Sequence, residues 1–530
     1  MKLESEIEKI CSICHNTRNM KALIGLILSI LANPCSSFAE PQWWNQFRGP
    51  NGSGVMIDCH PPVDLEKNLA WKVPVGAGLS SPALSDGRVF LTITENRRLF
   101  TVAFEKSTGK LVWRRGAPDV PLEKVHATSS PATPTPLVEG DRVYVYFGSF
   151  GLLCYDTEGT ELWKKSIPTP KSLYGMATSP IMYGDHLILV LDTDTNLPDS
   201  KLSQSKIIAV DKTNGKTAWE IARPFNRSSW SVPMIWKHDD RSELVVLGSG
   251  RVSGYDLERR EEEWFATGFS RETIAIPIAG DGKIFIAAAM LGGSGDEQPD
   301  PLPFWNAIKP FDKNNDDKIE RAEMTAGFTF PFRPELPIGH PGFGLPLPKE
   351  GKEREKRLDG VLRWVDKDNN GVWEREEFLK NMSGGRGKPI LMAIKPGGKG
   401  NINDTHVEWQ LHRGIPEIPS PIHLDKRVYL VRKGGLVNAV DAVSGDVIYR
   451  ERIDGAAGQY SASPVIANDK LYAISAQGVM SILATGDDFE MLHQHDLGEA
   501  AHVTPALDQN TIYIRGENHL FAFRRPKPSS

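Results

Sequence analysis

The stretch SSPALSDGRVF, residues 80–90, places Pro82 seven residues before Val89, which opens an apolar run typical of a β-strand. A turn rich in Ser, Asp and Gly separates the two. The same spacing recurs at Pro136, Pro180, Pro277, Pro421, Pro464 and Pro505, and Pro233 marks an eighth copy with a longer turn. Recurrence of one local pattern along the chain indicates a repeat architecture.

A second pattern follows most of these copies. It consists of a strand, a tight turn that usually contains glycine, and a strand with a large aromatic residue, as in AFEKSTGKLVW at residues 103–113. One ring per repeat buries a large area between neighbouring sheets, so we interpret these rings as packing groups. The aromatic residues are Trp113, Trp163, Trp219, Trp264 and Tyr449.

Each unit supplies about four short strands in roughly 40–50 residues, which is the spacing of a propeller blade. We therefore predict an all-β fold, an eight-bladed β-propeller of four-stranded antiparallel blades with an inserted α-helical EF-hand module. The last copy is one strand short. The strand near residues 68–75, which bears Trp71, is expected to complete that blade and close the propeller.

The interval between Pro277 and Pro421 is far longer than the others and contains two candidate metal-binding loops. Residues 366–377, DKDNNGVWEREE, match the calcium-binding loop of an EF-hand, with Gly371 at the sharp turn. Calcium prefers six to eight oxygen ligands, which alternate residues of a tight loop point inward. The expected ligands are Asp366, Asp368, Asn370, the Val372 carbonyl, Glu374 and Glu377.

Residues 312–323, DKNNDDKIERAE, form the other loop. Its expected ligands are Asp312, Asn314, Asp316, the Lys318 carbonyl, Glu320 and Glu323. Asp317 stands where glycine is expected, and a positive φ costs Asp about 1 kcal/mol. We predict weaker binding here, so that the protein holds one or two Ca²⁺ ions. Ile319 and Trp373 share one loop position, at which paired loops meet in a short β-bridge.

Similar apolar patterns before both loops predict one apolar helix face each. The module is expected between the second and third strands of the fifth blade, because a loop insertion is tolerated where its ends re-enter an existing hairpin. The Pro-rich connector at residues 328–350 is expected to lie over that face of the propeller as irregular chain. The predicted domains are 1–39, a signal-peptide region; 40–290, the first part of the propeller; 291–388, the EF-hand pair; and 389–526, the second part.

The apolar run at residues 22–33 is too short to span a bilayer and is typical of a signal peptide. Lys21 supplies its positive flank, Ala39 a cleavage position, and we interpret Met20 as the start of translation. The protein is expected to be exported, either to the periplasm or cell envelope of a bacterium or into the medium, with no transmembrane segment in the mature chain. Of five cysteines, Cys59 and Cys154 follow this region, which allows one disulfide at most.

A formal net charge of −5 and a pI near 6.3 give no electrostatic reason to expect a nucleic-acid partner. The sequence contains no P-loop, GxSxG or HExxH motif, so hydrolase and kinase functions lack their motifs.

With these repeats and the leader WWNQFRGPNGSG at residues 43–54, the chain resembles the PQQ-binding-like β-propeller repeat proteins of the quinoprotein alcohol dehydrogenase-like superfamily. The resemblance covers nearly the whole mature chain. This group includes quinoprotein dehydrogenases and BamB-like scaffolds without catalysis, so it implies the fold more firmly than a reaction.

Three hypotheses follow. The preferred one is an exported calcium-binding propeller that acts as a non-catalytic scaffold, with a protein or small ligand at the propeller face that bears the insertion. The second is a PQQ-dependent alcohol or sugar dehydrogenase. The resemblance implies that PQQ would lie between a tryptophan and two adjacent cysteines, and no adjacent pair stands here. The third is a calcium-responsive sensor.

Catalytic and quinone-binding residues cannot be assigned from the sequence. His126, His406 and His502 stand near strand starts. They are candidates either for a ligand or metal cluster at a channel mouth lined by the Ser/Thr-Pro starts, or for structural hydrogen bonding.

Overall fold

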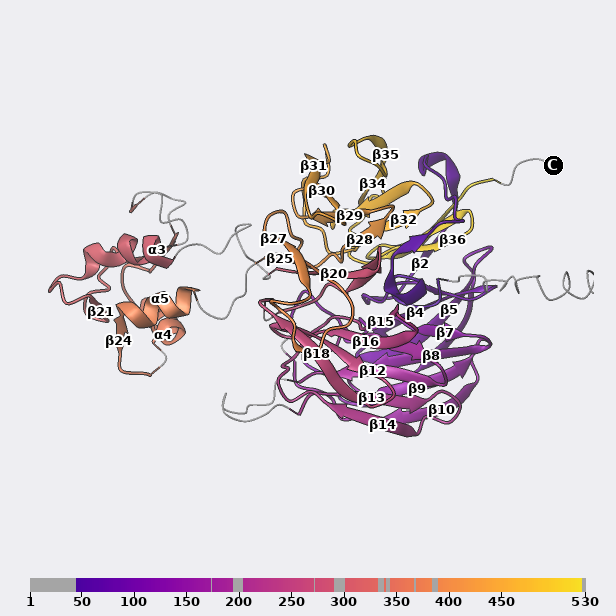
Figure 1. Ribbon diagram of the computed structural model, residues 1–530, viewed down its shortest axis with the longest axis horizontal. Helices are drawn as coiled ribbons and strands as arrows, with labels where there is room; N and C mark the ends of the chain where they lie inside the picture. Colours follow the sequence, from indigo (N-terminus) through magenta and orange to yellow (C-terminus); the bar gives the residue numbers. More distant parts are fainter. Residues whose placement is uncertain are drawn as a thin grey trace, which may run out of the picture. The chain divides into compact units, whose positions relative to one another are not determined.

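The computed structural model describes residues 44–172, 174–193, 204–270, 272–289, 301–331, 338–339, 344–366, 368–383 and 389–526. The predicted signal-peptide region, residues 1–39, lies outside the described residues. Eight small antiparallel sheets make an eight-bladed β-propeller, which confirms the predicted fold class (Figure 1). Within the described residues, no helix combines the length and the apolar character needed to cross a membrane.

Consecutive strands form each of the first four blades. These blades are β3 (Ala83–Leu84), β4 (Arg88–Glu95), β5 (Arg98–Glu105) and β6 (Leu111–Gly116); β7 (Leu137–Glu139), β8 (Arg142–Phe147), β9 (Gly151–Asp156) and β10 (Glu161–Ser166); β11 (Ile181–Tyr183), β12 (His186–Leu191), β13 (Lys206–Asp211) and β14 (Thr217–Ala222); and β15 (Met234–His238), β16 (Arg241–Leu247), β17 (Arg251–Asp256) and β18 (Glu261–Thr267).

The last four blades contain the insertion and the closure of the propeller. They are β19 (Ile278–Gly280), β20 (Lys283–Ala288), β25 (Ile390–Ile394) and β27 (Val407–Leu411); β28 (Ile422–Leu424), β29 (Arg427–Arg432), β30 (Leu436–Asp441) and β31 (Val447–Arg452); β32 (Val465–Ala467), β33 (Lys470–Ile474), β34 (Val479–Ala484) and β35 (Met491–Asp496); and β36 (Ala506–Asp508), β37 (Thr511–Arg515), β38 (His519–Arg524) and β2 (Leu69–Pro74).

The insertion leaves the fifth blade after β20 and returns at β25, and these two strands pair with each other, with Ala288 opposite Ile390. Its elements are α3 (Pro301–Ile308), the 3₁₀ turn η3 (Lys309–Phe311), β21 (Lys318–Glu320), β22 (Thr329–Pro331), β23 (Gly344–Pro346), α4 (Lys352–Val365), β24 (Val372–Glu374) and α5 (Arg375–Ser383). Four further short elements lie outside the insertion and are not among the blade strands given above. They are η1 (Pro50–Gly52), β1 (Val55–Met56), η2 (Glu66–Asn68) and β26 (Gly400–Asn401).

The eighth blade is completed from both ends of the propeller sequence. β2 pairs antiparallel with β38, and Trp71 lies opposite Ala522. The Trp71 indole N–H then donates to the Lys106 carbonyl of the first blade at 3.1 Å. A Cβ on Gly109 would lie 2.7 Å from the Trp71 ring, so only glycine leaves room for this contact.

The same contact joins other neighbouring blades. Each tryptophan ring lies against the turn glycine of the following blade, where φ is between +73° and +89° and a Cβ would stand 2.6–2.8 Å from the ring. Each indole N–H donates to a backbone carbonyl of that blade. Trp113 and Trp163 are therefore packing groups, as predicted, and Trp409 has the same role although it was not among the predicted rings. The pairs are Trp113 with Gly159, Trp163 with Gly215, and Trp409 with Gly445.

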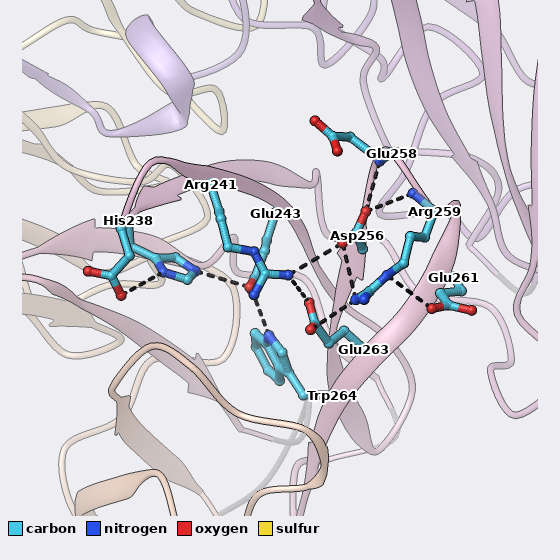
Figure 2. A network of polar contacts seen from close by, with 10 residues as sticks. His238, Arg241, Glu243, Asp256, Glu258, Arg259, Glu261, Glu263 and Trp264 are labelled. Atoms are coloured by element: carbon cyan, nitrogen blue, oxygen red, sulfur yellow. Dashed lines mark hydrogen bonds and ion pairs between the residues drawn. The ribbon is translucent and has the colours of Figure 1, made fainter.

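The fourth blade departs from this pattern. Its turn carries Arg260, with φ +61°, in place of glycine, and the guanidinium lies 5.9 Å from the Trp219 ring. Trp264 instead donates within its own blade to Glu243 Oε2 at 2.7 Å, and Glu243 Oε1 lies 3.0 Å from His238 Nε2 (Figure 2). A buried carboxylate thus replaces the usual carbonyl acceptor.

Hydrogen bonds made by the Ser or Thr before a repeat proline explain the Ser/Thr-Pro pattern. The Thr135 N–H donates to Ser179 Oγ at 2.9 Å. Farther along, the Ser420 N–H donates to Ser463 Oγ at 2.9 Å, and the Ser463 N–H to Thr504 Oγ1 at 3.0 Å. Because the following proline keeps this residue extended, its N–H and hydroxyl reach the adjacent blades. These hydroxyls therefore join neighbouring blades.

The leader, residues 44–54, contacts the first strands of several blades. Its carbonyls accept from the N–H groups of Leu84 in β3 and Val138 in β7, both at 2.8 Å. The Asn51 side chain donates to the Ile235 carbonyl of β15 at 2.7 Å and accepts from its N–H at 3.0 Å. The leader therefore links strands that lie far apart in the sequence.

Arg48 anchors the other half of the leader. Its fully buried guanidinium donates to the carbonyls of Gly52 at 3.1 Å, Pro421 at 2.8 Å and Pro464 at 3.4 Å. Burial lowers the pKa of Arg48 to about 9. β1 follows and pairs in parallel with β32, so the leader also reaches the sixth and seventh blades.

The Pro-rich connector is not wholly irregular chain, which corrects the prediction. β22 and β23 form an antiparallel ladder. Phe328, Phe330 and Leu347 are buried in the hydrophobic cluster of the insertion itself. The aromatic residues of the connector find their apolar partners inside the module, which accounts for this local order.

Candidate metal centre

The second loop is shaped by its own side-chain oxygens. Asp366 accepts from the N–H groups of Asn370 at 3.1 Å and Gly371 at 2.9 Å. Asp368 accepts from Asn370 N–H at 3.1 Å, and Asn370 Oδ1 accepts from Val372 N–H at 2.8 Å. Gly371 adopts φ +83°, as a sharp turn at this position requires. These bonds orient the first three expected ligands of the loop.

Three carboxylates converge at this loop. One oxygen from each of Asp366, Asp368 and Glu377 lies within 4.8 Å of the others. Glu377 reaches the loop from the first turn of α5. Glu374 lies elsewhere and forms an exposed ion pair with Lys318 at 3.0 Å. A set of hard oxygen donors at this spacing is suited to Ca²⁺.

The first loop has the same local geometry. Asp312 accepts from the N–H groups of Asp316 at 3.2 Å and Asp317 at 3.0 Å. Glu323 accepts from Lys313 N–H at 2.7 Å and from Glu320 N–H at 2.9 Å. This carboxylate therefore folds back over the start of its own loop.

Two further expected ligands of the first loop, Asn314 and Asp316, also accept hydrogen bonds from backbone N–H groups of the turn. Asn314 Oδ1 accepts from Asp316 N–H at 3.1 Å, and Asp316 Oδ1 accepts from Lys318 N–H at 3.0 Å. Asp317 has φ +58°, the left-handed conformation that Gly371 adopts in the other loop, and its carboxylate pairs with Lys309 at 3.1 Å.

The two loops are joined through β21 and β24, where Ile319 lies opposite Trp373. Both side chains are fully buried. Around them a hydrophobic cluster gathers residues from α3, α4, α5 and the connector, including Trp305, Leu362 and Phe378. The loops are therefore held in a fixed register by one shared core.

The module differs from the predicted pair of helix-loop-helix units, because the described part of the insertion contains three helices. α3 and η3 precede the first loop, with Pro310 at the point where the α-helix tightens into a 3₁₀ turn. No helix lies between that loop and β22, a stretch that the structure describes completely. The chain turns after Glu320 and continues into β22. The Phe328–Phe330 segment occupies the core position that an exiting helix would otherwise fill.

The three histidines do not form a cluster. In the described residues, the group with metal-binding spacing is the carboxylate set of the second loop. His126 contacts Thr128 at 2.9 Å and its ring lies tilted against Tyr174, while His406 contacts Thr405 at 2.9 Å. His126 and His406 are thus used in local contacts.

The two cysteines are free thiols. Cys59 and Cys154 are each buried, and burial raises the pKa of each to about 12. The disulfide that the sequence allows is therefore not formed. Neither residue has an adjacent cysteine, so these residues do not fit the cysteine pair that the resemblance associates with PQQ.

Sequence reasoning missed a buried ion pair between the third and fourth blades. Arg223 binds both carboxylate oxygens of Asp192, at 2.8 and 3.0 Å, and both side chains are fully buried. Tyr255 and Ser229 complete the network at 2.6 and 2.8 Å. Its members come from distant segments, and no local pattern in the sequence marks them.

A buried carboxyl between the first and second blades was also missed. Glu123 Oε2 accepts from Met176 N–H at 3.1 Å, and the Glu123 N–H donates to Ser149 Oγ at 3.0 Å. Burial raises the pKa of Glu123 from its ordinary value of 4.5 to about 7, although the bond from Met176 opposes this shift.

This shift predicts that the protein loses stability as the pH rises through 7. Between pH 4.5 and 7 the folded state holds a proton on Glu123 that the unfolded state has released. The free energy of unfolding therefore decreases with rising pH, by at most about 3 kcal/mol. Glu123→Gln should remove this dependence and exceed the wild type in stability at pH 8. Urea unfolding at pH 5 and pH 8 measures the change in the free energy of unfolding, and Glu490→Gln, at an exposed glutamate, serves as the control. Equal pH dependence in wild type and E123Q would contradict the assignment.

Comparison with protein-family models matches residues 63–292 and 399–527 to the model described as outer membrane protein assembly factor BamB. The unmatched interval between these segments contains the insertion. A search of curated proteins found no match.

Three solved structures are similar to this chain. BamB from Moraxella catarrhalis is 12% identical, with 87% of this chain and 100% of that chain covered and a TM-score of 0.47. A europium-containing methanol dehydrogenase is 10% identical, with coverage of 84% and 90% and a TM-score of 0.45. A quinohemoprotein alcohol dehydrogenase from Pseudomonas putida HK5 is 10% identical, with coverage of 93% and 83% and a TM-score of 0.47.

The family match extends over more than half of the chain and includes strands from all eight blades. The protein therefore belongs to the PQQ-like β-propeller family described as outer membrane protein assembly factor BamB.

Proposed function

We propose that the protein is an exported, calcium-binding β-propeller that acts as a non-catalytic scaffold of the cell envelope. The observation that carries the calcium proposal is the convergence of Asp366, Asp368 and Glu377 within 4.8 Å at a loop paired with a second loop of the same geometry. Three like charges at this spacing repel one another, and a divalent cation between them would turn that repulsion into attraction.

The expected ligands fall into a stronger and a weaker set. The stronger set is Asp366, Asp368, Asn370, the Val372 carbonyl, Glu374 and Glu377; the weaker set is Asp312, Asn314, Asp316, the Lys318 carbonyl, Glu320 and Glu323. Asp317 supports this order because a non-glycine residue at φ +58° is strained. Glu374 would have to exchange Lys318 for the ion or for a water bound to it.

The core of the module supports a constitutive ion rather than a switch. A calcium sensor opens its helices and exposes an apolar groove. Here Phe328 and Phe330 of the connector pack edge-on against Trp373 and fill the centre of the cluster, with ring centroids 5.9 Å apart in each pair. Opening of the helices would expose these rings together with the groove. This raises the free-energy cost of opening.

The scaffold proposal rests on the family and on how the insertion is attached. The family is described as an assembly factor, which supports a protein partner. The module extends from the ends of β20 and β25, on the same edge of the fifth blade as the links to its neighbours. We propose that this edge of the propeller, with the module, is the partner-binding face.

Removal of the module tests the calcium proposal. In the variant, Asn-Gly replaces residues 291–388 and connects β20 to β25, which already pair. The propeller should fold, with β-rich circular dichroism, and calorimetric titration with Ca²⁺ should show no site, whereas the full chain shows at least one. Calcium binding that persists in the shortened chain would overturn the proposal.

A separate experiment tests the proposal that the protein is not an enzyme. The full chain is incubated with PQQ, Ca²⁺ and a panel of alcohols and sugars, with a dye as electron acceptor. No reduction of the dye above background is expected. Sustained turnover would replace the scaffold proposal with the dehydrogenase hypothesis.

A further inference from the structure

Three arginines share one face of the sixth blade. Arg432 on β29 lies opposite Leu436 on β30, which in turn lies opposite Arg452 on β31. Residues opposite each other across a sheet point to the same side. Arg450 is two residues from Arg452 and shares this face, while Glu451 between them points to the other side. The row is therefore cationic, in a chain whose net charge is −5.

This face borders a pocket of about 650 Å³ between the sixth and seventh blades. Besides Arg432 and Arg452, its lining residues include Lys433, Gln459 and Gln477. Gln459 lies in the connection between the two blades and Gln477 in the turn after β33. Residues with cationic and amide side chains, from several separate elements, thus line the pocket.

Glycines hold this arrangement in place. Gly434 has φ +80°, and Arg452 Nη1 donates to its carbonyl; a Cβ there would lie 2.5 Å from that nitrogen. The Gly434 N–H donates to the Gly458 carbonyl at 2.8 Å, which ties the turn to the neighbouring connection. Lys433 contacts Glu417 at 2.5 Å. Arg450 is engaged by Asn438 at 2.9 Å.

We propose that this pocket binds a tetrahedral oxyanion, the phosphate or sulfate group of a soluble molecule or of a lipid headgroup, between Arg432, Arg452 and Gln477. A planar guanidinium presents two parallel N–H groups to such an ion. Arg432, Arg452 and Gln477 come from three separate elements, β29, β31 and the turn after β33. Donors from separate elements suit a tetrahedral ion, which displays oxygens in all directions, better than a planar carboxylate. This site is independent of the calcium module.

Calorimetric titration of the full chain with inorganic phosphate tests the proposal. Arg452→Gln should weaken binding at least about tenfold, and Gln477→Leu, which leaves the charge unchanged, at least about threefold. Arg114→Gln, at an exposed arginine on the outer strand of the first blade, should leave it within about twofold. Wild-type affinity should fall as NaCl is raised. Acetate should bind more weakly than phosphate.

Two results would overturn the proposal: no binding of phosphate below about 10 mM, or equal affinity in wild type, R452Q and Q477L with circular dichroism unchanged. Vesicles separate the two sources of the anion. Binding to phosphatidylglycerol vesicles that is lost in R452Q indicates a lipid headgroup. Phosphate binding without vesicle binding indicates a soluble ligand. Acetate binding as tight as phosphate would refute the tetrahedral specificity.

Discussion

Replacing Asp192 with alanine is expected to lower the free energy of unfolding by about 3–5 kcal/mol. The substitution leaves the Arg223 guanidinium fully buried without the carboxylate that binds two of its nitrogens. Tyr255 alone cannot neutralise the remaining charge. Urea unfolding, followed by circular dichroism and by tryptophan fluorescence, measures the change.

Two control variants separate the loss of charge compensation from the loss of packing. Asp192→Leu combined with Arg223→Met removes both charges and should destabilise much less than D192A, because no ion is left buried without a partner. Glu220→Ala breaks the exposed pair with Lys206 and should cost about 0.5 kcal/mol or less. A cost for D192A below about 1 kcal/mol would show that water reaches Arg223 in the folded protein.

Glu377→Gln is expected to weaken calcium binding at the second loop by at least about tenfold, which is about 1.4 kcal/mol. The amide offers one oxygen in place of a charged carboxylate that can bind with two. Calorimetric titration with Ca²⁺ measures the effect. Glu376→Gln changes an exposed neighbour on α5 and serves as the matched control.

The outcome also tests the ranking of the loops. If Asp312→Asn in the first loop abolishes the tighter site while E377Q binds as the wild type does, the stronger ion belongs to the first loop. Such a result would mean that the Asp317 carboxylate contributes more to binding than its positive φ costs.

The propeller was predictable because its determinants are local and repeated. The Ser/Thr-Pro starts, the turn glycines and the tryptophans recur along the chain, and most of them make the same kind of contact to a neighbouring blade. One short pattern therefore indicates all eight sheets, although the fourth blade departs from it. The loops of the insertion were recognisable for a similar reason: Gly371 and alternate acidic residues specify a turn within twelve positions.

Features that depend on distant segments escaped prediction. Asp192 and Arg223 directly follow β12 and β14, so they meet only once the sheet of the third blade has formed. Glu123 becomes buried through contacts with Ser149 and Met176. The missing helix after the first loop was not predictable either, because burial of Phe328 in the shared core, and not local propensity, decides that segment. The Ser/Thr-Pro pattern was found from the sequence, but the hydrogen bonds that its hydroxyls make between blades were not predicted.

The pairing of β2 with β38 has a consequence for how the molecule is made. Trp71 is synthesised among the first residues of the propeller, yet its sheet partner is among the last. The final blade cannot assemble until translation has passed that distant strand, and such sequence-remote pairing is intrinsically slow. Until then the nascent chain carries an unpaired strand and a leader without its partner strands, and such exposed edges favour aggregation.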